Sequence, residues 1–164
     1  MDHQNADHFE RLGLPRRFSV DLSELERNYL ARSREVHPDF HSGNIDAVED
    51  ASAALNDAYS TLREPFRRAE HLLKLLGGPS AKDDKSLPPA FLMEMLELRE
   101  EVETAKGSPA EVARIEADLL ARTNALEQSL GILFQQTDAR ILIRRELNCV
   151  RYLSGLLRDL HSPR

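Results

Sequence analysis

Apolar residues recur at every third or fourth position along nearly the whole chain, and no stretch alternates in the manner of a β-strand. This spacing gathers apolar side chains on one side of a helix, where they pack against a neighbour. The chain has 164 residues, 41% of them hydrophobic, which is enough to bury a core. The sequence therefore predicts an all-α protein.

A stretch rich in Gly, Pro and charge, GGPSAKDDKSLPP at residues 77–89, separates the helical patterns into two groups. Such composition is typical of a segment between domains. Before it lies a helical hairpin. Beyond it, three long helical patterns with short connections predict an antiparallel three-helix bundle. We expect an N-terminal unit at residues 1–76, a connector at 77–88 and the bundle at 89–164.

Two helix starts carry capping signals. Asp21 precedes the first long helix of the hairpin and is followed three residues later by Glu24, which predicts a reciprocal capping box. Ser108 precedes the second helix of the bundle, with Pro109 in the first turn and Glu111 placed to close another box.

Charge and cysteine content exclude several classes of protein. The net charge is -6 and 30% of residues are charged, which favours a monomeric cytoplasmic protein and argues against general nucleic-acid binding. A single cysteine, Cys149, excludes an internal disulfide and a cysteine-rich metal site within this chain. No apolar run reaches the roughly 18 residues that a membrane span requires, and the polar start reads as neither a secretory nor a mitochondrial signal.

The segment EVHPDFHSGN, residues 35–44, joins the two hairpin helices through His37, Pro38 and Asp39. Pro and Asp are ordinary turn residues, so a plain turn is one interpretation. A metal site of His37, Asp39 and His41 is a second, although Pro38 breaks the helical register that would bring the two rings together. Acid–base catalysis by His37 and Asp39 is a third interpretation, but the turn has no evident nucleophile or oxyanion donor. A docking tip for another protein is the remaining interpretation.

The context of this tripeptide resembles a J-domain. Tyr29 lies eight residues before His37, and LNDAYSTLREP follows in the next helix. The resemblance implies that the tip docks on a DnaK-type chaperone and stimulates its ATP hydrolysis. It implies polar contacts from His37 and Asp39 and a turn fixed by Pro38. These residues would bias the partner's conformation and catalyse nothing themselves, so an enzyme is not expected.

Arginines on the first hairpin helix support docking. At about 100° per residue, Arg27 and Arg34 lie opposite the apolar stripe of Leu22, Leu25 and Tyr29. They predict an exposed basic strip that faces an acidic surface of the chaperone. An ordinary solvated helix face is the alternative.

The first bundle helix carries more apolar residues than one core face needs. Phe91, Met95, Leu98, Val102 and Ala105 form its core stripe. Leu92, Met93 and Leu96 lie outside that stripe, beside Glu97 and Glu100. A helix that touches two neighbours would explain Leu92 but not Met93. Exposed apolar clusters mark binding surfaces and Met adapts to such contacts, so we expect a protein-binding face that Tyr152 extends.

Taken together, LNDAYSTLREPFRRAEHLL and FLMEMLELREEVE resemble the HscB family of J-type co-chaperones over essentially the whole chain. The resemblance implies an L-shaped arrangement of two units, in which the bundle binds the iron–sulfur scaffold IscU and the J-domain presents it to the chaperone HscA. It assigns Leu92, Met93, Leu96, Glu97, Glu100 and Tyr152 to the scaffold-binding face. Thr104 replaces a further acidic family position. No cofactor is implied, and the missing N-terminal cysteine motif of eukaryotic relatives favours a bacterial type. A general J-protein without an iron–sulfur role is the alternative.

Overall fold

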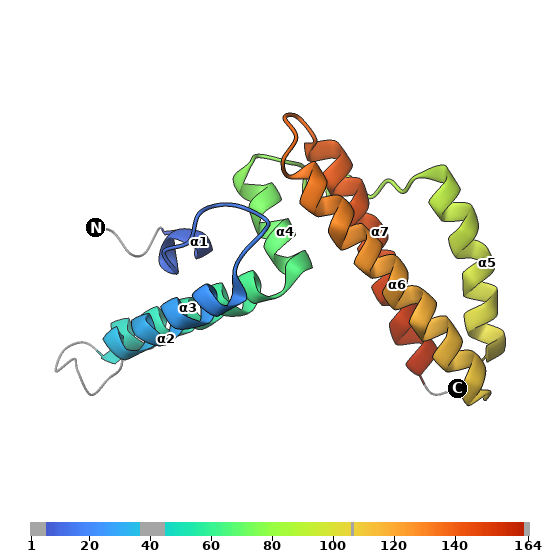
Figure 1. The fold of residues 1–164 in the computed structure, drawn as a ribbon, viewed down its shortest axis with the longest axis horizontal. Coiled ribbons are helices and arrows are strands. Elements are labelled where there is room, and N and C mark those ends of the chain that lie inside the picture. Colours follow the sequence, from blue (N-terminus) through green and yellow to red (C-terminus); the bar gives the residue numbers. More distant parts are fainter. Residues whose placement is uncertain (1–5, 37–44, 106, 163–164) are drawn as a thin grey trace. The chain divides into compact units, whose positions relative to one another are not determined.

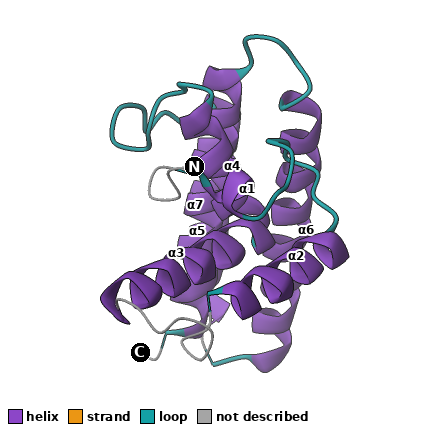
Figure 2. Cartoon of the chain, turned by 90° about the vertical axis from the view of Figure 1, so that its left-hand side faces the viewer, coloured by secondary structure: helices purple, strands orange, loops and turns teal. Residues whose placement is uncertain are grey.

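The computed structural model describes residues 6–36, 45–105 and 107–162, and every regular element in this part of the chain is a helix (Figures 1 and 2). The predicted all-α class is confirmed. The helices are α1 (His8–Arg11), α2 (Leu22–Glu35), α3 (Ile45–Arg63), α4 (Pro65–Leu75), α5 (Pro89–Ala105), α6 (Pro109–Leu133) and α7 (Arg140–His161). The chain divides into two compact units, Met1–Leu72 and Leu73–Arg164.

In the N-terminal unit, α3 packs against both α1 and α2. Leu25 of α2 is fully buried, as its stripe predicts, and the rings of Tyr29 and Tyr59 stack with centroids 4.3 Å apart. The Tyr29 hydroxyl donates to Oδ1 of Asn56 on α3 at 2.8 Å. Leu22 begins the same stripe in the first turn of α2 but has 52% of its surface exposed.

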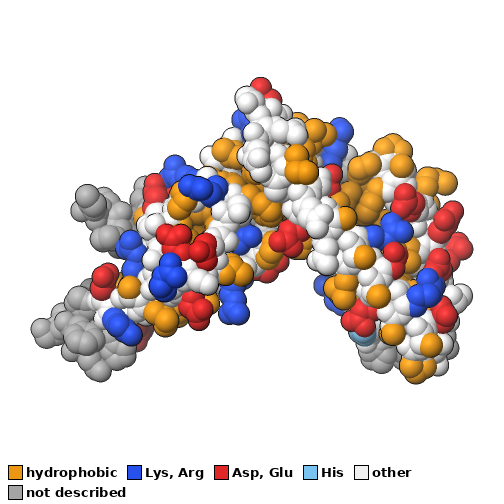
Figure 3. All heavy atoms as spheres, in the orientation of Figure 1, with side chains coloured by type: hydrophobic (Ala, Val, Ile, Leu, Met, Phe, Trp, Pro, Cys, Tyr) orange, Lys and Arg blue, Asp and Glu red, His pale blue; other side chains and the backbone are white. Residues whose placement is uncertain are grey.

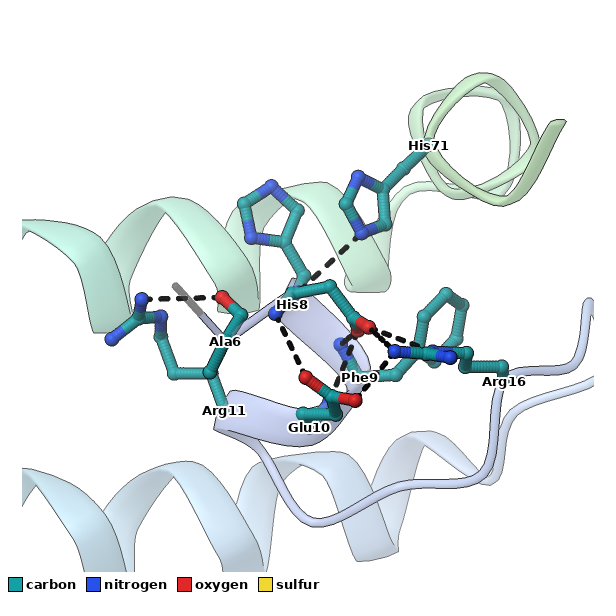
Figure 4. A network of polar contacts seen from close by, with 8 residues as sticks. Ala6, His8, Phe9, Glu10, Arg11, Arg16 and His71 are labelled. Atoms are coloured by element: carbon teal, nitrogen blue, oxygen red, sulfur yellow. Dashed lines mark hydrogen bonds and ion pairs between the residues drawn. The ribbon is translucent and has the colours of Figure 1, made fainter. Parts of the chain in front are cut away.

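The short helix α1 is stabilised by a network at its N-terminus (Figure 4). The Asp7 carboxylate accepts the amides of Phe9 and Glu10, and the Glu10 side chain accepts the Asp7 amide, which completes a capping box. Arg16 donates to Asp7 at 2.7 Å. Burial by itself would raise the pKa of Asp7, but hydrogen bonds from Glu10, Arg16 and Phe9 outweigh it and hold that pKa below its usual value.

The second anchor of α1 is a pair of stacked histidines. The rings of His8 and His71 lie 4.1 Å apart, and the backbone amide of His8 donates to Nε2 of His71 on α4 at 3.4 Å (Figure 4). Nε2 of His8 lies 3.5 Å from the carboxylate of Asp57 on α3. Burial lowers the pKa of His8 below its usual value, although the charge of Asp57 acts to raise it. The stacking of His8 on His71 and its contact with Asp57 therefore tie α1 to α4 and α3.

The predicted capping boxes are only partly formed. Asp21 accepts the amides of Ser23 and Glu24, so it caps α2 as predicted, but the reciprocal bond from the Glu24 side chain is not made. Ser108 stands at the N-cap of α6 without a side-chain cap hydrogen bond, so that prediction is wrong. The carboxylate of Glu111, expected to close the box, is instead bound by Arg114 one turn later at 3.0 Å.

The C-terminal unit is built from α5, α6 and α7, and each of these helices packs against the other two. Its core is a cluster of buried apolar side chains with members from all three helices: Met95, Leu98, Val102, Ala105, Ile115, Leu119, Leu153, Leu156 and Leu160. The predicted core stripe of α5 is thereby confirmed, with Phe91 half-buried at its start. Within the described part of the bundle, α5 therefore packs on α6 and α7 through this stripe.

Candidate functional site

The outer side of α5 carries the strongest candidate for a binding surface. Leu92, Met93 and Leu96 expose 41%, 64% and 51% of their surface. Figure 3 shows apolar side chains gathered near the start of α5, with acidic side chains beside them. We call these three residues the α5 patch. Met93 is not among the residues that pack against the bundle core, so a helix that touches two neighbours does not explain its place in the patch.

Four of the five carboxylates of α5 fall into two groups. Glu94 is bound by Arg122 of α6 at 2.7 Å, and Glu101 is bound by Arg114 of α6 at 2.6 Å. Both acids are therefore neutralised within the bundle. Glu97 and Glu100 are exposed. Helix geometry explains these two groups. Glu94 and Glu101 are seven residues apart and share one helix face, whereas Glu97 and Glu100 point in other directions.

The acidic rim does not continue at Thr104. Its hydroxyl donates to the backbone carbonyls of Glu100 and Glu101, at 3.1 and 3.0 Å. A threonine that bonds back to its own helix presents its methyl group instead of a charge. The rim beside the α5 patch is therefore formed by Glu97 and Glu100.

Tyr152 connects the α5 patch to the core. It is half-buried on α7 and meets the ring of Phe91 edge to face, with centroids 6.1 Å apart. Phe91 directly precedes Leu92, so the aromatic pair lies next to the patch. The structure thus brings Tyr152 to the start of α5, although part of its surface is used within the bundle.

The predicted chaperone-docking residues divide between two parts of the chain. His37, Pro38 and Asp39 lie outside the described residues, as does His41 of the metal alternative. Arg27 and Arg34 are exposed on α2, and Arg34 lies in its last turn, next to the predicted tip. Neither arginine forms an ion pair with another described residue, so both guanidinium groups are presented to solvent.

Buried titratable groups in the bundle do not form a reactive centre. Burial raises the pKa of Cys149 to about 12, with the charge of Glu146 adding to the effect, so the thiol stays protonated. Burial also raises the pKa of Glu146, opposed by a hydrogen bond from Ser129. Over residues 6–36, 45–105 and 107–162, no three His, Cys, Asp or Glu side chains converge as metal ligands. None of the helices in these ranges has the length and apolar character to cross a membrane.

Two features of the C-terminal unit were missed from the sequence. Six further apolar side chains of this unit are exposed away from the α5 patch, namely Leu75, Leu76, Leu120, Ile132, Ile141 and Leu142. Arg144 and Asn148 of α7 are buried and bind each other. Their spacing of four residues indicates contact on one helix face, but no local pattern predicts that these two polar residues lie inside the bundle.

Comparison with known proteins gives matches over both units. Residues 7–71 match the DnaJ domain, and residues 87–161 match the HSCB C-terminal oligomerisation domain. The co-chaperone protein HscB homolog of Bordetella petrii is 33% identical over 163 residues, covering 96% of each chain. The co-chaperone protein HscB of Proteus mirabilis is 38% identical over 122 residues, covering 71% of this chain and 69% of the relative.

Solved structures agree with these sequence matches. Human co-chaperone protein HscB superposes with a TM-score of 0.83 and 31% identity, covering 95% of this chain and 81% of the human chain. The chaperone HscB from Vibrio cholerae gives a TM-score of 0.78 and 28% identity, covering 94% of this chain and 95% of the other.

Proposed function

This chain belongs to the HscB family of co-chaperones, and from that premise we propose that its C-terminal unit binds the iron–sulfur scaffold protein IscU and delivers it to the DnaK-type chaperone HscA. The observation that carries the proposal is the exposure of Leu92, Met93 and Leu96 on a helix whose core stripe is already satisfied. The proposed face comprises these three residues with Glu97, Glu100 and Tyr152.

The chemistry of this face fits a protein client. Full burial of a Leu or Met side chain is worth about 1.5–3 kcal/mol, so covering three half-exposed ones supplies the apolar centre of an interface. Exposed carboxylates at the rim steer a basic client surface and reject an acidic one. Glu97 and Glu100 serve this purpose because Arg122 and Arg114 engage other acids of α5.

We assign the chaperone contact to the N-terminal unit. His37, Pro38 and Asp39 form the tip that stimulates ATP hydrolysis by HscA, and Arg27 and Arg34 attract the chaperone's acidic surface. Holding client and chaperone on one chain raises the effective concentration of each for the other. The protein acts in the cytoplasm as a monomer and requires no cofactor, metal or catalytic residue of its own for either contact.

A general J-protein, whose bundle only stabilises the fold, is the competing function. It shares the tip and the basic strip, so those residues do not distinguish the two. The α5 patch does, because a purely stabilising bundle gains nothing from exposing Met93. The competing function therefore predicts no affinity for IscU at this surface.

Titration of IscU against the full chain tests the proposal. Met93→Asp places a charge at the centre of the patch and should weaken IscU binding by roughly 30-fold or more, the scale of an interface hot spot. Leu120→Asp is the matched control, since Leu120 is also an exposed apolar residue but lies on α6. Equal IscU affinity for wild type and Met93→Asp would refute the assignment of the patch.

A further inference from the structure

A buried amide side chain on α7 binds the segment that leads into α5. Nδ2 of Asn148 donates to the carbonyl of Asp84 at 3.1 Å and to the carbonyl of Ser86 at 3.0 Å. These carbonyls lie more than 60 residues away in sequence, and α5 begins three residues after Ser86. One side chain therefore connects α7 to the approach to α5.

Arg144 determines which way the Asn148 amide points. Arg144 is completely buried, and its Nε donates to Oδ1 of Asn148 at 3.0 Å. Because arginine only donates, the amide oxygen must face it, which turns both N–H groups of Asn148 toward the connector. The two donors then match the two carbonyls, so the orientation of the Asn148 amide has a physical cause.

The bound segment is itself preorganised. The Asp84 carboxylate accepts both the amide and the hydroxyl of Ser86, at 2.8 and 2.6 Å. These bonds hold the pKa of Asp84 below its usual range, with the charges of Arg145 and Arg144 adding to the effect. Residues 84–86 therefore present their carbonyls to Asn148 as a formed turn.

Asn148 and Tyr152 stand one turn apart on α7. Asn148 holds the connector, and Tyr152 contacts Phe91 in the first turn of α5. The start of α5 is thus located against α7 at two consecutive turns. We infer that Asn148, oriented by Arg144, is a positioning residue that holds Leu92 and Met93 in register with Tyr152, so that the three form one binding face.

This inference rests on the proposed binding of IscU, since the face matters only if a client uses it. Asn148 itself lies in the interior and touches no client. By holding the start of α5 in one arrangement, Asn148 lowers the conformational cost of binding the client. Loss of this anchor should weaken client binding without altering the chaperone-stimulating unit.

Asn148→Asp is the most informative change. It preserves side-chain size and gives Arg144 a carboxylate partner, but it removes both donors to the connector. Asn124→Asp on the exposed side of α6 is the matched control, because it makes the same chemical change away from the connector. Should Asn148→Asp not fold, the double variant Arg144→Met/Asn148→Leu replaces the whole polar pair by apolar side chains of similar volume.

Hydrogen exchange of the full chain supplies a readout that is independent of IscU. We expect amides in residues 85–92 to exchange roughly tenfold faster in Asn148→Asp, with exchange in α6 unchanged, because local opening sets the rate. The Asn124→Asp control should match wild type. Unchanged exchange at residues 85–92 in the folded variant would overturn the inference.

HscA ATPase stimulation with increasing IscU supplies the second readout. The IscU concentration for half-maximal stimulation should rise roughly fivefold in Asn148→Asp, while stimulation without IscU and at saturating IscU stays at the wild-type level, as for a loss of preorganisation. Faster exchange with an unchanged half-maximal concentration would overturn the positioning role. Failure of the wild type to bind IscU would instead refute the proposed function. The exchange result would still show whether Asn148 holds the segment that leads into α5.

Discussion

The ring of Tyr152 on α7 meets the ring of Phe91 on α5 at 83°, with centroids 6.1 Å apart. This edge-to-face geometry is the favourable arrangement for two aromatic side chains. Tyr152 therefore belongs to the bundle core through Phe91 and to the proposed client face through its remaining exposed surface. Changes at Tyr152 should affect stability and binding together, unlike changes at Met93.

Tyr152→Ala should destabilise the protein by about 1–3 kcal/mol, less than a fully buried aromatic residue would, and should also weaken IscU binding. Tyr152→Phe keeps the contact between rings and should stay within about 0.5 kcal/mol of wild type. Denaturant unfolding of the full chain measures the first effect and IscU titration the second. Wild-type stability in Tyr152→Ala would show that the aromatic pair contributes nothing to the bundle.

Reversing the charge of both Arg27 and Arg34 to Glu should reduce chaperone stimulation by roughly tenfold and should remove much of its dependence on ionic strength, since exposed charges act mainly through steering. Arg158→Glu on α7 is a control, because Arg158 is an exposed arginine of the other unit. ATPase rates over a range of salt concentrations provide the measurement. A similar loss in Arg158→Glu would indicate a nonspecific effect of net charge.

Acidification should loosen α1 from the N-terminal unit. Burial lowers the pKa of His8, so the folded state favours the neutral ring. The resulting stability is present above the ordinary histidine pKa near 6.5 and is lost as the pH falls through the lower folded value. Protonation of His71 would also remove the acceptor for the His8 amide.

Thermal unfolding at about pH 7.5 and pH 5.5 measures this effect, because histidine titrates between these values. The wild type should lose stability on acidification, and the double variant His8→Gln/His71→Gln should lose less. His161→Gln serves as control, because His161 is exposed near the end of α7. An equal loss in all three proteins would exclude the histidine pair as the origin.

Much of the fold follows from local signals in the sequence. The core stripe of α5 and the cap at Asp21 depend on periodicity and on a single side chain, and both are confirmed. The capping box predicted at Ser108 is not formed: the Ser108 amide donates to the carbonyl of Ala105 at 2.9 Å, and the Glu111 carboxylate is bound by Arg114 on its own helix. Local patterns do not indicate which of two available partners a carboxylate will choose.

The candidate site shows the same division between local and distant contacts. The exposure of Met93 follows from its angle on the helix. Other contacts depend on how segments distant in sequence pack together. These are the ion pair of Glu94 with Arg122 and the hydrogen bonds from Asn148 to residues 84–86. Periodicity therefore locates the α5 patch, while the bundle determines which acids surround it and what positions it.

The central claim is that client and chaperone bind separate surfaces of one chain, and HscA ATPase activity measured with and without IscU tests it most directly. We predict that wild type and IscU together stimulate far beyond the sum of their separate effects. Met93→Asp should keep the IscU-free stimulation and lose the synergy. Asp39→Asn or His37→Gln should abolish stimulation while still binding IscU. Synergy that survives Met93→Asp, or stimulation that survives both tip variants, would contradict the account.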